Sequence, residues 1–111
     1  MKKVFIIHGF MGEPNGGWKP WLMGELYKNE TYACALPMPD PNNPKKEAWI
    51  KTIRDAVNLE EDEIFLVGHS LGAAAILRYL ETLPEGQSIS GVVLVSGPAY
   101  MINTENPDSK L

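Results

Sequence analysis

Four short runs of apolar residues alternate along the chain with stretches in which apolar residues recur at helical spacing. The apolar runs are Val4–Ile7, Thr31–Leu36, Ile64–Val67 and Gly91–Val95. None of them shows the strict alternation of apolar and polar residues that is typical of a strand with one face in water. Each run therefore predicts a strand that is buried on both faces, as in a parallel sheet.

Between these strands, the spacing of the apolar residues predicts three helices. The first covers about residues 18–28 and places at helical spacing Trp18, Trp21, Leu22, Glu25 and Leu26. The second begins with Asn43 as its N-cap and Pro44 as its first residue, and it carries one apolar stripe, formed by Trp49, Ile50, Ile53, Ala56 and Val57. The third runs from about Leu71 to Leu83 and ends before Pro84.

The strands and helices alternate strictly, which predicts an α/β fold with a parallel sheet between two layers of helices. We expect a single domain over residues 1–111, because the length fits one small core. Ligands bind such sheets at the carboxyl ends of the strands. Three loops qualify there: residues 8–17, 37–43 and 68–72.

One of these loops carries the pattern G-x-S-x-G, in the residues Gly68, His69, Ser70, Leu71 and Gly72. It lies directly between a predicted strand and a predicted helix, which is the context of a nucleophile elbow. In such an elbow the serine stands on a sharp turn, and the glycines let helix and strand approach closely. We therefore expect Ser70 to be a nucleophile. The alternative is a glycine-rich turn whose serine only faces solvent.

An acyl-transferring serine also needs N–H groups that stabilise an oxyanion. The backbone N–H of Leu71 is the first candidate, because it follows the nucleophile. The loop that begins His8-Gly9 offers the second donor, with Phe10 favoured over Met11. The alternative for this loop is a turn that Gly9 merely permits.

Composition excludes several other classes of function. Ten basic and fourteen acidic residues give a net charge of −4, which argues against nucleic-acid binding. The acidic residues are dispersed, so we expect no metal site, and no G-x-G-x-x-G follows the first strand, so we expect no dinucleotide cofactor. No apolar segment approaches the length of a membrane span. The single cysteine, Cys34, gives no sign of disulfides, and a cytoplasmic protein is the expectation.

Further sequence features spread over the chain strengthen this interpretation. They are His8-Gly9-Phe10 with Trp18 and Trp21, Met38-Pro39-Asp40-Pro41, Trp49, the elbow with Arg78-Tyr79, and Val92–Ser96. With these residues the chain resembles the N-terminal part of the retinoblastoma-binding protein nine/YdeN-like family of serine hydrolases, in the α/β-hydrolase superfamily. The resemblance implies a minimal hydrolase core with strand order 2-1-3-4, a Ser-Asp-His triad, and an ester or related small acyl substrate.

The resemblance also implies that the triad aspartate and histidine lie beyond residue 111, because they follow the serine in hydrolases of this type. Neither His8 nor His69 is a convincing base: His8 is expected to brace its loop, and the elbow should turn the His69 side chain away. The competing interpretation is a catalytically inactive fragment or short homologue that acts through protein contacts. The apolar edge Val92–Val95 favours self-association, although the polar segment Asn103–Lys110 would shield part of it.

Overall fold

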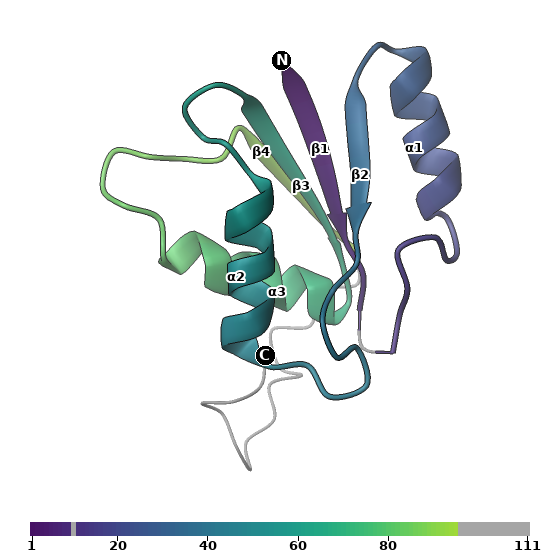
Figure 1. Ribbon diagram of the computed structural model, residues 1–111. Coiled ribbons are helices and arrows are strands. Elements are labelled where there is room, and N and C mark those ends of the chain that lie inside the picture. The colour runs from purple at the N-terminus through teal and green to yellow at the C-terminus, as the bar shows by residue number, and fades with distance from the viewer. Residues whose placement is uncertain (10, 96–111) are drawn as a thin grey trace.

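The computed structural model describes residues 1–9 and 11–95, which build a four-stranded sheet with helices on both faces (Figure 1). Its strands are β1 (Lys2–Ile7), β2 (Tyr32–Leu36), β3 (Glu63–His69) and β4 (Gly91–Val95). Every neighbouring pair is parallel and the order is β2-β1-β3-β4. The predicted fold class and strand order are confirmed.

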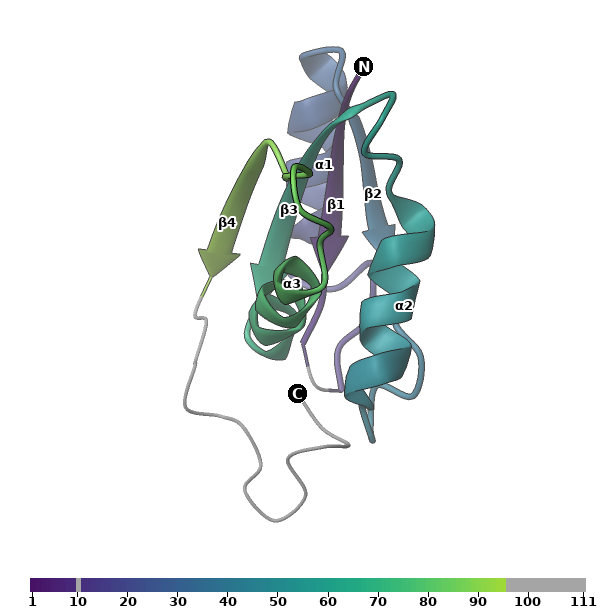
Figure 2. The same ribbon diagram turned by 90° about the vertical axis from the view of Figure 1, so that its left-hand side faces the viewer.

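Three helices connect the strands, namely α1 (Lys19–Lys28), α2 (Lys46–Ala56) and α3 (Leu71–Glu81). Figure 2 shows α1 on one face of the sheet and both α2 and α3 on the other. The longest of these helices have 11 residues, so no helix in the described ranges is long and apolar enough to cross a membrane.

The position of β1 in the sheet, covered on both faces, explains why its sequence shows no alternation of apolar and polar residues. Phe5 and Ile7 belong to the core under α2 and α3, whereas Val4 and Ile6 belong to the smaller core under α1. Side chains of a strand point alternately to the two faces, so a strand covered on both sides needs apolar residues throughout. Ile7 pairs in register with Gly68, which brings the carboxyl ends of β1 and β3 to one edge of the sheet.

The predicted start of the second helix is wrong by two residues. The backbone N–H of Asn43 donates a hydrogen bond to the Asp40 carbonyl at 2.9 Å, which closes a turn in the preceding loop. Lys45 is still extended, with φ −111° and ψ 132°, and α2 begins only at Lys46. The Asn43 backbone is therefore held in that turn, and Asn43 is not the N-cap.

The apolar stripe of α1 is also rotated relative to the prediction. Its sheet-facing side carries Lys19, Leu22, Met23 and Leu26, whereas Trp21 is 67% exposed. Residues 19, 22, 23 and 26 have the i, i+3, i+4, i+7 spacing of one helix face. A lysine thus occupies the first position of the buried face.

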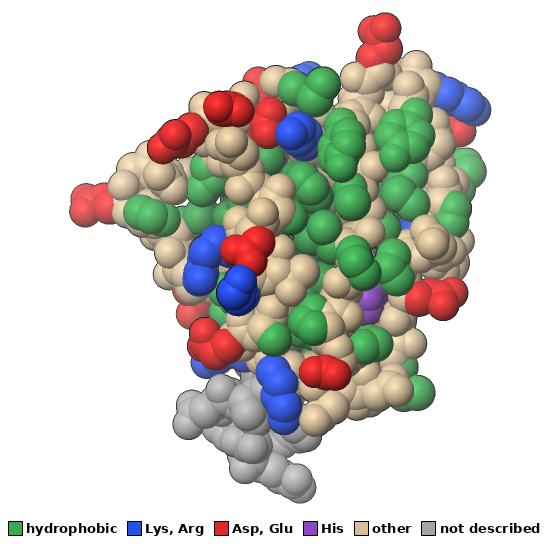
Figure 3. Space-filling model, in the orientation of Figure 1, with side chains coloured by type: hydrophobic (Ala, Val, Ile, Leu, Met, Phe, Trp, Pro, Cys, Tyr) green, Lys and Arg blue, Asp and Glu red, His purple; other side chains and the backbone are tan. Residues whose placement is uncertain are grey.

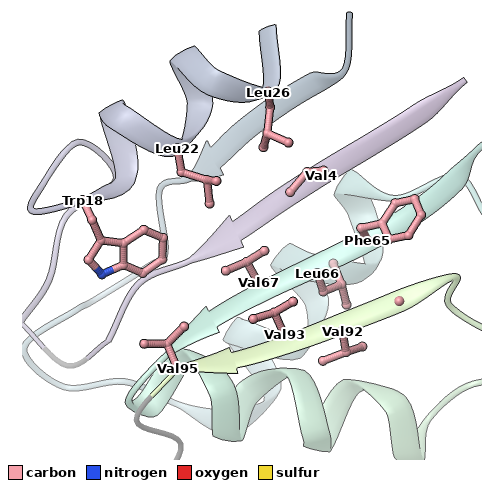
Figure 4. A pocket seen from close by; sticks show the side chains of 11 residues that line it. Val4, Trp18, Leu22, Leu26, Phe65, Leu66, Val67, Val92, Val93 and Val95 are labelled. Atoms are coloured by element: carbon pink, nitrogen blue, oxygen red, sulfur yellow. The ribbon is translucent and has the colours of Figure 1, made fainter. Parts of the chain in front are cut away.

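Strand β4 forms one edge of the sheet, and it pairs only with β3 in the part of the chain that the structure describes. Beside it, the face that carries α1 is hollowed into an open apolar groove of about 640 Å³, with β3 and β4 as its floor and α1 as its wall (Figure 4). Val93 is 56% exposed in this groove. Figure 3 shows hydrophobic side chains gathered over the strands between α2 and α1.

Candidate active site

Ser70 is the single residue between β3 and α3, and its backbone has φ 57° and ψ −118°. The left-handed region is costly for a residue with a side chain, so surrounding contacts must hold this conformation. The Ser70 N–H donates to the Val95 carbonyl at 3.0 Å, and the Ser70 carbonyl accepts from the Ala73 N–H at 3.0 Å. The side chain itself is half-buried. The arrangement has the geometry of a strained strand-to-helix elbow.

The two glycines that flank the elbow are required by close packing. A Cβ at Gly68 would lie 2.7 Å from the Cα of Ala73, inside the first turn of α3. A Cβ at Gly72 would overlap the Ile7 carbonyl oxygen and lie 2.6 Å from that of His8. Helix α3 thus starts directly against the end of β1, at a distance that no side chain permits.

The loop after β1 touches the elbow through Gly9. A Cβ at Gly9 would lie 3.1 Å from the Cβ of Ser70 and 3.5 Å from the amide nitrogen of Leu71. Within the described backbone, no carbonyl accepts a hydrogen bond from the Leu71 N–H. Phe10, the predicted second oxyanion donor, lies outside the described residues, so its role stays a prediction.

His8 is 1% exposed, and backbone groups occupy both of its ring nitrogens. Its Nε2 accepts a hydrogen bond from the Met38 N–H at 3.3 Å, which places the ring proton on Nδ1, 2.9 Å from the Gly9 carbonyl that accepts it. Burial lowers the pKa of His8 and is the largest effect, the hydrogen bond to Gly9 opposes it, and the weaker effects of the Lys19 and Glu13 charges lower and raise the pKa, respectively. A neutral imidazole therefore links the loop after β1 to the loop after β2.

The loop after β2 is fixed by Trp49 of α2. Its indole N–H donates to the Pro39 carbonyl at 2.7 Å, and its ring lies edge-on to the His8 ring at 5.6 Å. A further hydrogen bond joins the Met11 N–H to the Pro41 carbonyl at 2.8 Å. These contacts connect both loops to the core beneath the elbow.

His69 points to the face of the sheet that carries α1. Its ring lies edge-on to Trp18 with 6.0 Å between centroids, and the residue is half-buried. Among the described residues, neither histidine forms a hydrogen bond with the Ser70 hydroxyl. The same residues also contain no cluster of three or more His, Cys, Asp and Glu side chains that could hold a metal ion.

Beside Ser70 lies a hollow of about 350 Å³, which we call the Ser70 hollow. It is lined by Gly9, Gly12, Glu13, Gly16, Gly17, Trp18, Lys19, His69 and Ser70. Glu13 and Lys19 were not among the predicted site residues. Lys19 is 6% exposed and burial lowers its pKa, with Glu13 acting in the opposite direction. The spacing of Lys19 with Leu22, Met23 and Leu26 is the sequence signal that indicates its burial.

Comparison with known proteins gives a consistent result. A family described as serine hydrolase matches residues 4–110. The Bacillus subtilis (strain 168) protein YdeN, named as a hydrolase, is 39% identical over 103 residues, which are 93% of this chain and 54% of YdeN. The serine hydrolase RBBP9 of Rattus norvegicus is 31% identical over 91 residues, which are 81% of this chain and 46% of RBBP9. The chain thus spans about half the length of these relatives.

Solved structures agree with the fold. The crystal structure of the Bacillus subtilis ydeN gene product superposes with a TM-score of 0.77 at 38% identity, over 87% of this chain and 52% of that one. A YdeN-like protein from Pectobacterium atrosepticum gives a TM-score of 0.64 at 19% identity, over 84% of this chain and 48% of that one. The second similarity concerns the fold alone. The resemblance found in the sequence is confirmed.

Proposed function

The chain belongs to this serine hydrolase family, and we propose that it supplies Ser70 as the nucleophile that attacks the acyl carbon of an ester substrate. The observation that carries the proposal is the backbone of Ser70, held at φ 57° between β3 and α3 by its hydrogen bond to Val95. A structural turn has no need of an L-residue there, where glycine would be unstrained. Strain of this kind is typical of functional positions.

In the proposed reaction, the Ser70 oxygen forms a bond to the acyl carbon while a histidine takes the hydroxyl proton. The Leu71 N–H, together with an N–H of the loop that contains Phe10, donates to the oxyanion. Collapse of this intermediate expels the alcohol, which receives the proton from the histidine. Water then attacks the acyl-serine while the histidine takes a proton from it. The histidine returns this proton to the Ser70 oxygen as the acid is released, which restores Ser70.

We place that histidine, and the carboxylate that orients it, in a part of the protein outside residues 1–111. Two observations support this placement. His8 uses both ring nitrogens for backbone hydrogen bonds, and the His69 ring packs against Trp18. A general base must come within hydrogen-bond reach of the proton that it removes, and neither ring does so here.

Covalent labelling with a fluorophosphonate tests the nucleophile directly. In the full-length protein, we expect one adduct, mapped to Ser70 by mass spectrometry, and none in the Ser70→Ala variant. Ser88→Ala is the matched control, because Ser88 is an exposed loop serine and its removal should leave labelling intact. Labelling that persists in Ser70→Ala would exclude Ser70 as the nucleophile.

A second assay, ester turnover, separates the enzyme from a catalytically silent protein that acts through protein contacts. If residues 1–111 lack the base, their ester turnover should be lower than that of a complete triad by a factor on the order of 10⁴ or more. Robust turnover of a p-nitrophenyl ester by residues 1–111, lost in Ser70→Ala, would show that the base lies within this chain and would refute our placement of it.

A further inference from the structure

Lys19 lies in the wall of the Ser70 hollow, with most of its side chain buried. As the first residue of α1 it lies on the helix face that packs against the sheet, and only 6% of it is exposed. The ion pairs formed by the described residues are Lys3–Asp62, Lys28–Glu25, Lys51–Asp55 and Arg78–Glu81, and Lys19 is in none of them. No side-chain nitrogen of the described residues is both buried and without a hydrogen bond, so the apolar stem of Lys19 is buried while its ammonium stays accessible.

The contacts that Lys19 does make compensate its charge only partly. Its ammonium lies 5.6 Å from the centroid of the Trp18 ring, at the outer limit of a cation–π contact. Glu13 lines the same hollow, but it is exposed and forms no ion pair with Lys19. Burial correspondingly lowers the pKa of Lys19. The ammonium therefore retains the capacity to bind an anion within the hollow.

The start of α1 reinforces this positive charge. The amino end of a helix carries a partial positive charge, and acidic residues in the first turn usually balance it. The first turn of α1 contains no acidic residue. The helix terminus and Lys19 thus both add positive charge at the start of α1. They do so in a protein whose net charge is −4.

We propose that the Ser70 hollow is an anion subsite, in which Lys19 binds a carboxylate carried by the acyl group of the substrate. This inference rests on the proposed function, because it assigns a substrate class to the same nucleophile. A volume of about 350 Å³ accommodates a short acyl chain. The substrate class is then a half-ester of a short dicarboxylic acid, with one end at Ser70 and the free carboxylate at Lys19.

The test measures binding without chemistry, in the Ser70→Ala protein. Two probes of equal chain length are compared, monomethyl glutarate with its free carboxylate and the neutral methyl pentanoate. Binding is followed by NMR at the indole N–H of Trp18, which borders the hollow. We expect the anionic probe to bind about tenfold more tightly, as for a hydrogen bond to a charged group.

Two charge-removing variants show where that preference arises. Lys19→Met keeps the length of the side chain and removes the ammonium, so both probes should bind within about twofold of each other. Lys28→Met is the matched control, because it removes the same charge from the far, exposed end of α1. It should leave the preference intact.

Two further variants keep the test decisive should Lys19→Met not fold. Lys19→Arg retains the charge and should retain the preference. Glu13→Gln removes the exposed carboxylate that competes for Lys19, and it should tighten binding of the anionic probe about two- to threefold.

Equal binding of the two probes to the Ser70→Ala protein would overturn the proposal. So would a preference that survives in a folded Lys19→Met protein, or one that Lys28→Met removes equally. Because Ser70 is absent throughout, these outcomes are independent of fluorophosphonate labelling, which decides separately whether Ser70 is the nucleophile.

Discussion

Gly72 at the start of α3 packs so closely against Ile7 at the end of β1 that a Cβ at Gly72 would overlap the Ile7 carbonyl oxygen. The obstacle is backbone and not a flexible side chain, so it cannot move without displacing the strand. This contact sets the position of the α3 amino terminus, and with it the position of Ser70 and of the Leu71 N–H.

Replacing Gly72 by alanine should therefore destabilise the protein by about 3 kcal/mol, because the core must shift to admit one methyl group. Gly24→Ala is the matched control. Gly24 is inside α1, and a Cβ there meets nothing within 4 Å, so that variant should be neutral or up to about 1 kcal/mol more stable. Urea denaturation measures both. Similar effects of the two substitutions would contradict the close packing at Gly72.

Ser70→Gly should be about 1 kcal/mol more stable than Ser70→Ala, because glycine adopts φ 57° without strain whereas alanine does not. Both variants lack the hydroxyl, so the comparison isolates the backbone. The measurement is the difference between their free energies of unfolding. A Ser70→Gly protein no more stable than Ser70→Ala would mean that the elbow is not strained.

The stability of the protein should depend on pH through His8, whose folded-state pKa burial lowers from the usual 6.5. As the pH falls below 6.5, the unfolded chain binds a proton at this site before the folded protein does. The His8 contribution to the free energy of unfolding should thus be constant above pH 6.5 and decrease as the pH falls towards the folded-state pKa.

NMR titration of the His8 ring, with urea denaturation at about pH 7.5 and about pH 5.5, checks this expectation. In His8→Gln the loss of stability between the two pH values should be smaller, whatever the effect of the substitution at neutral pH. A His8 titration midpoint at or above 6.5 would contradict the interpretation that the buried ring is neutral.

The chain of residues 1–111 should self-associate in a concentration-dependent manner through the edge of β4, where Val93 is 56% exposed. An exposed apolar edge strand can pair with the same strand of a second copy, and a charged side chain on the edge opposes this. Val93→Lys should raise the dissociation constant, measured by sedimentation equilibrium, about tenfold.

Leu77→Lys serves as the control for this experiment, because it adds the same charge at an exposed position on α3 instead of on β4. It should leave the association unchanged. Equal effects of the two lysines would mean that net charge, and not the strand edge, governs association.

The features that the sequence predicted are those that local patterns govern. Val4–Ile7 has no polar position because it is covered on both faces, so its composition alone predicts a buried parallel strand. The elbow is likewise local, since G-x-S-x-G between strand and helix fixes a turn within five residues. The apolar stripe of the second helix was also predicted correctly, with Trp49, Ile50 and Ile53 buried.

The features that the sequence did not predict depend on contacts between distant segments. The turn from Asp40 to Asn43 delays the start of α2, and the rotation of α1 exposes Trp21. Helical spacing alone admits more than one stripe, and packing against the sheet selects between them.

The amino-acid sequence by itself determined the α/β fold, the strand order that its family resemblance implied, and the serine at the elbow. Only the tertiary structure decided the surroundings of that serine: the approach of Gly9, the two backbone hydrogen bonds of the His8 ring, and the burial of Lys19 beside the hollow. The physical reason is that spacing along the chain fixes which face a side chain occupies. Its charge compensation and its neighbours depend on segments that meet only when the sheet forms.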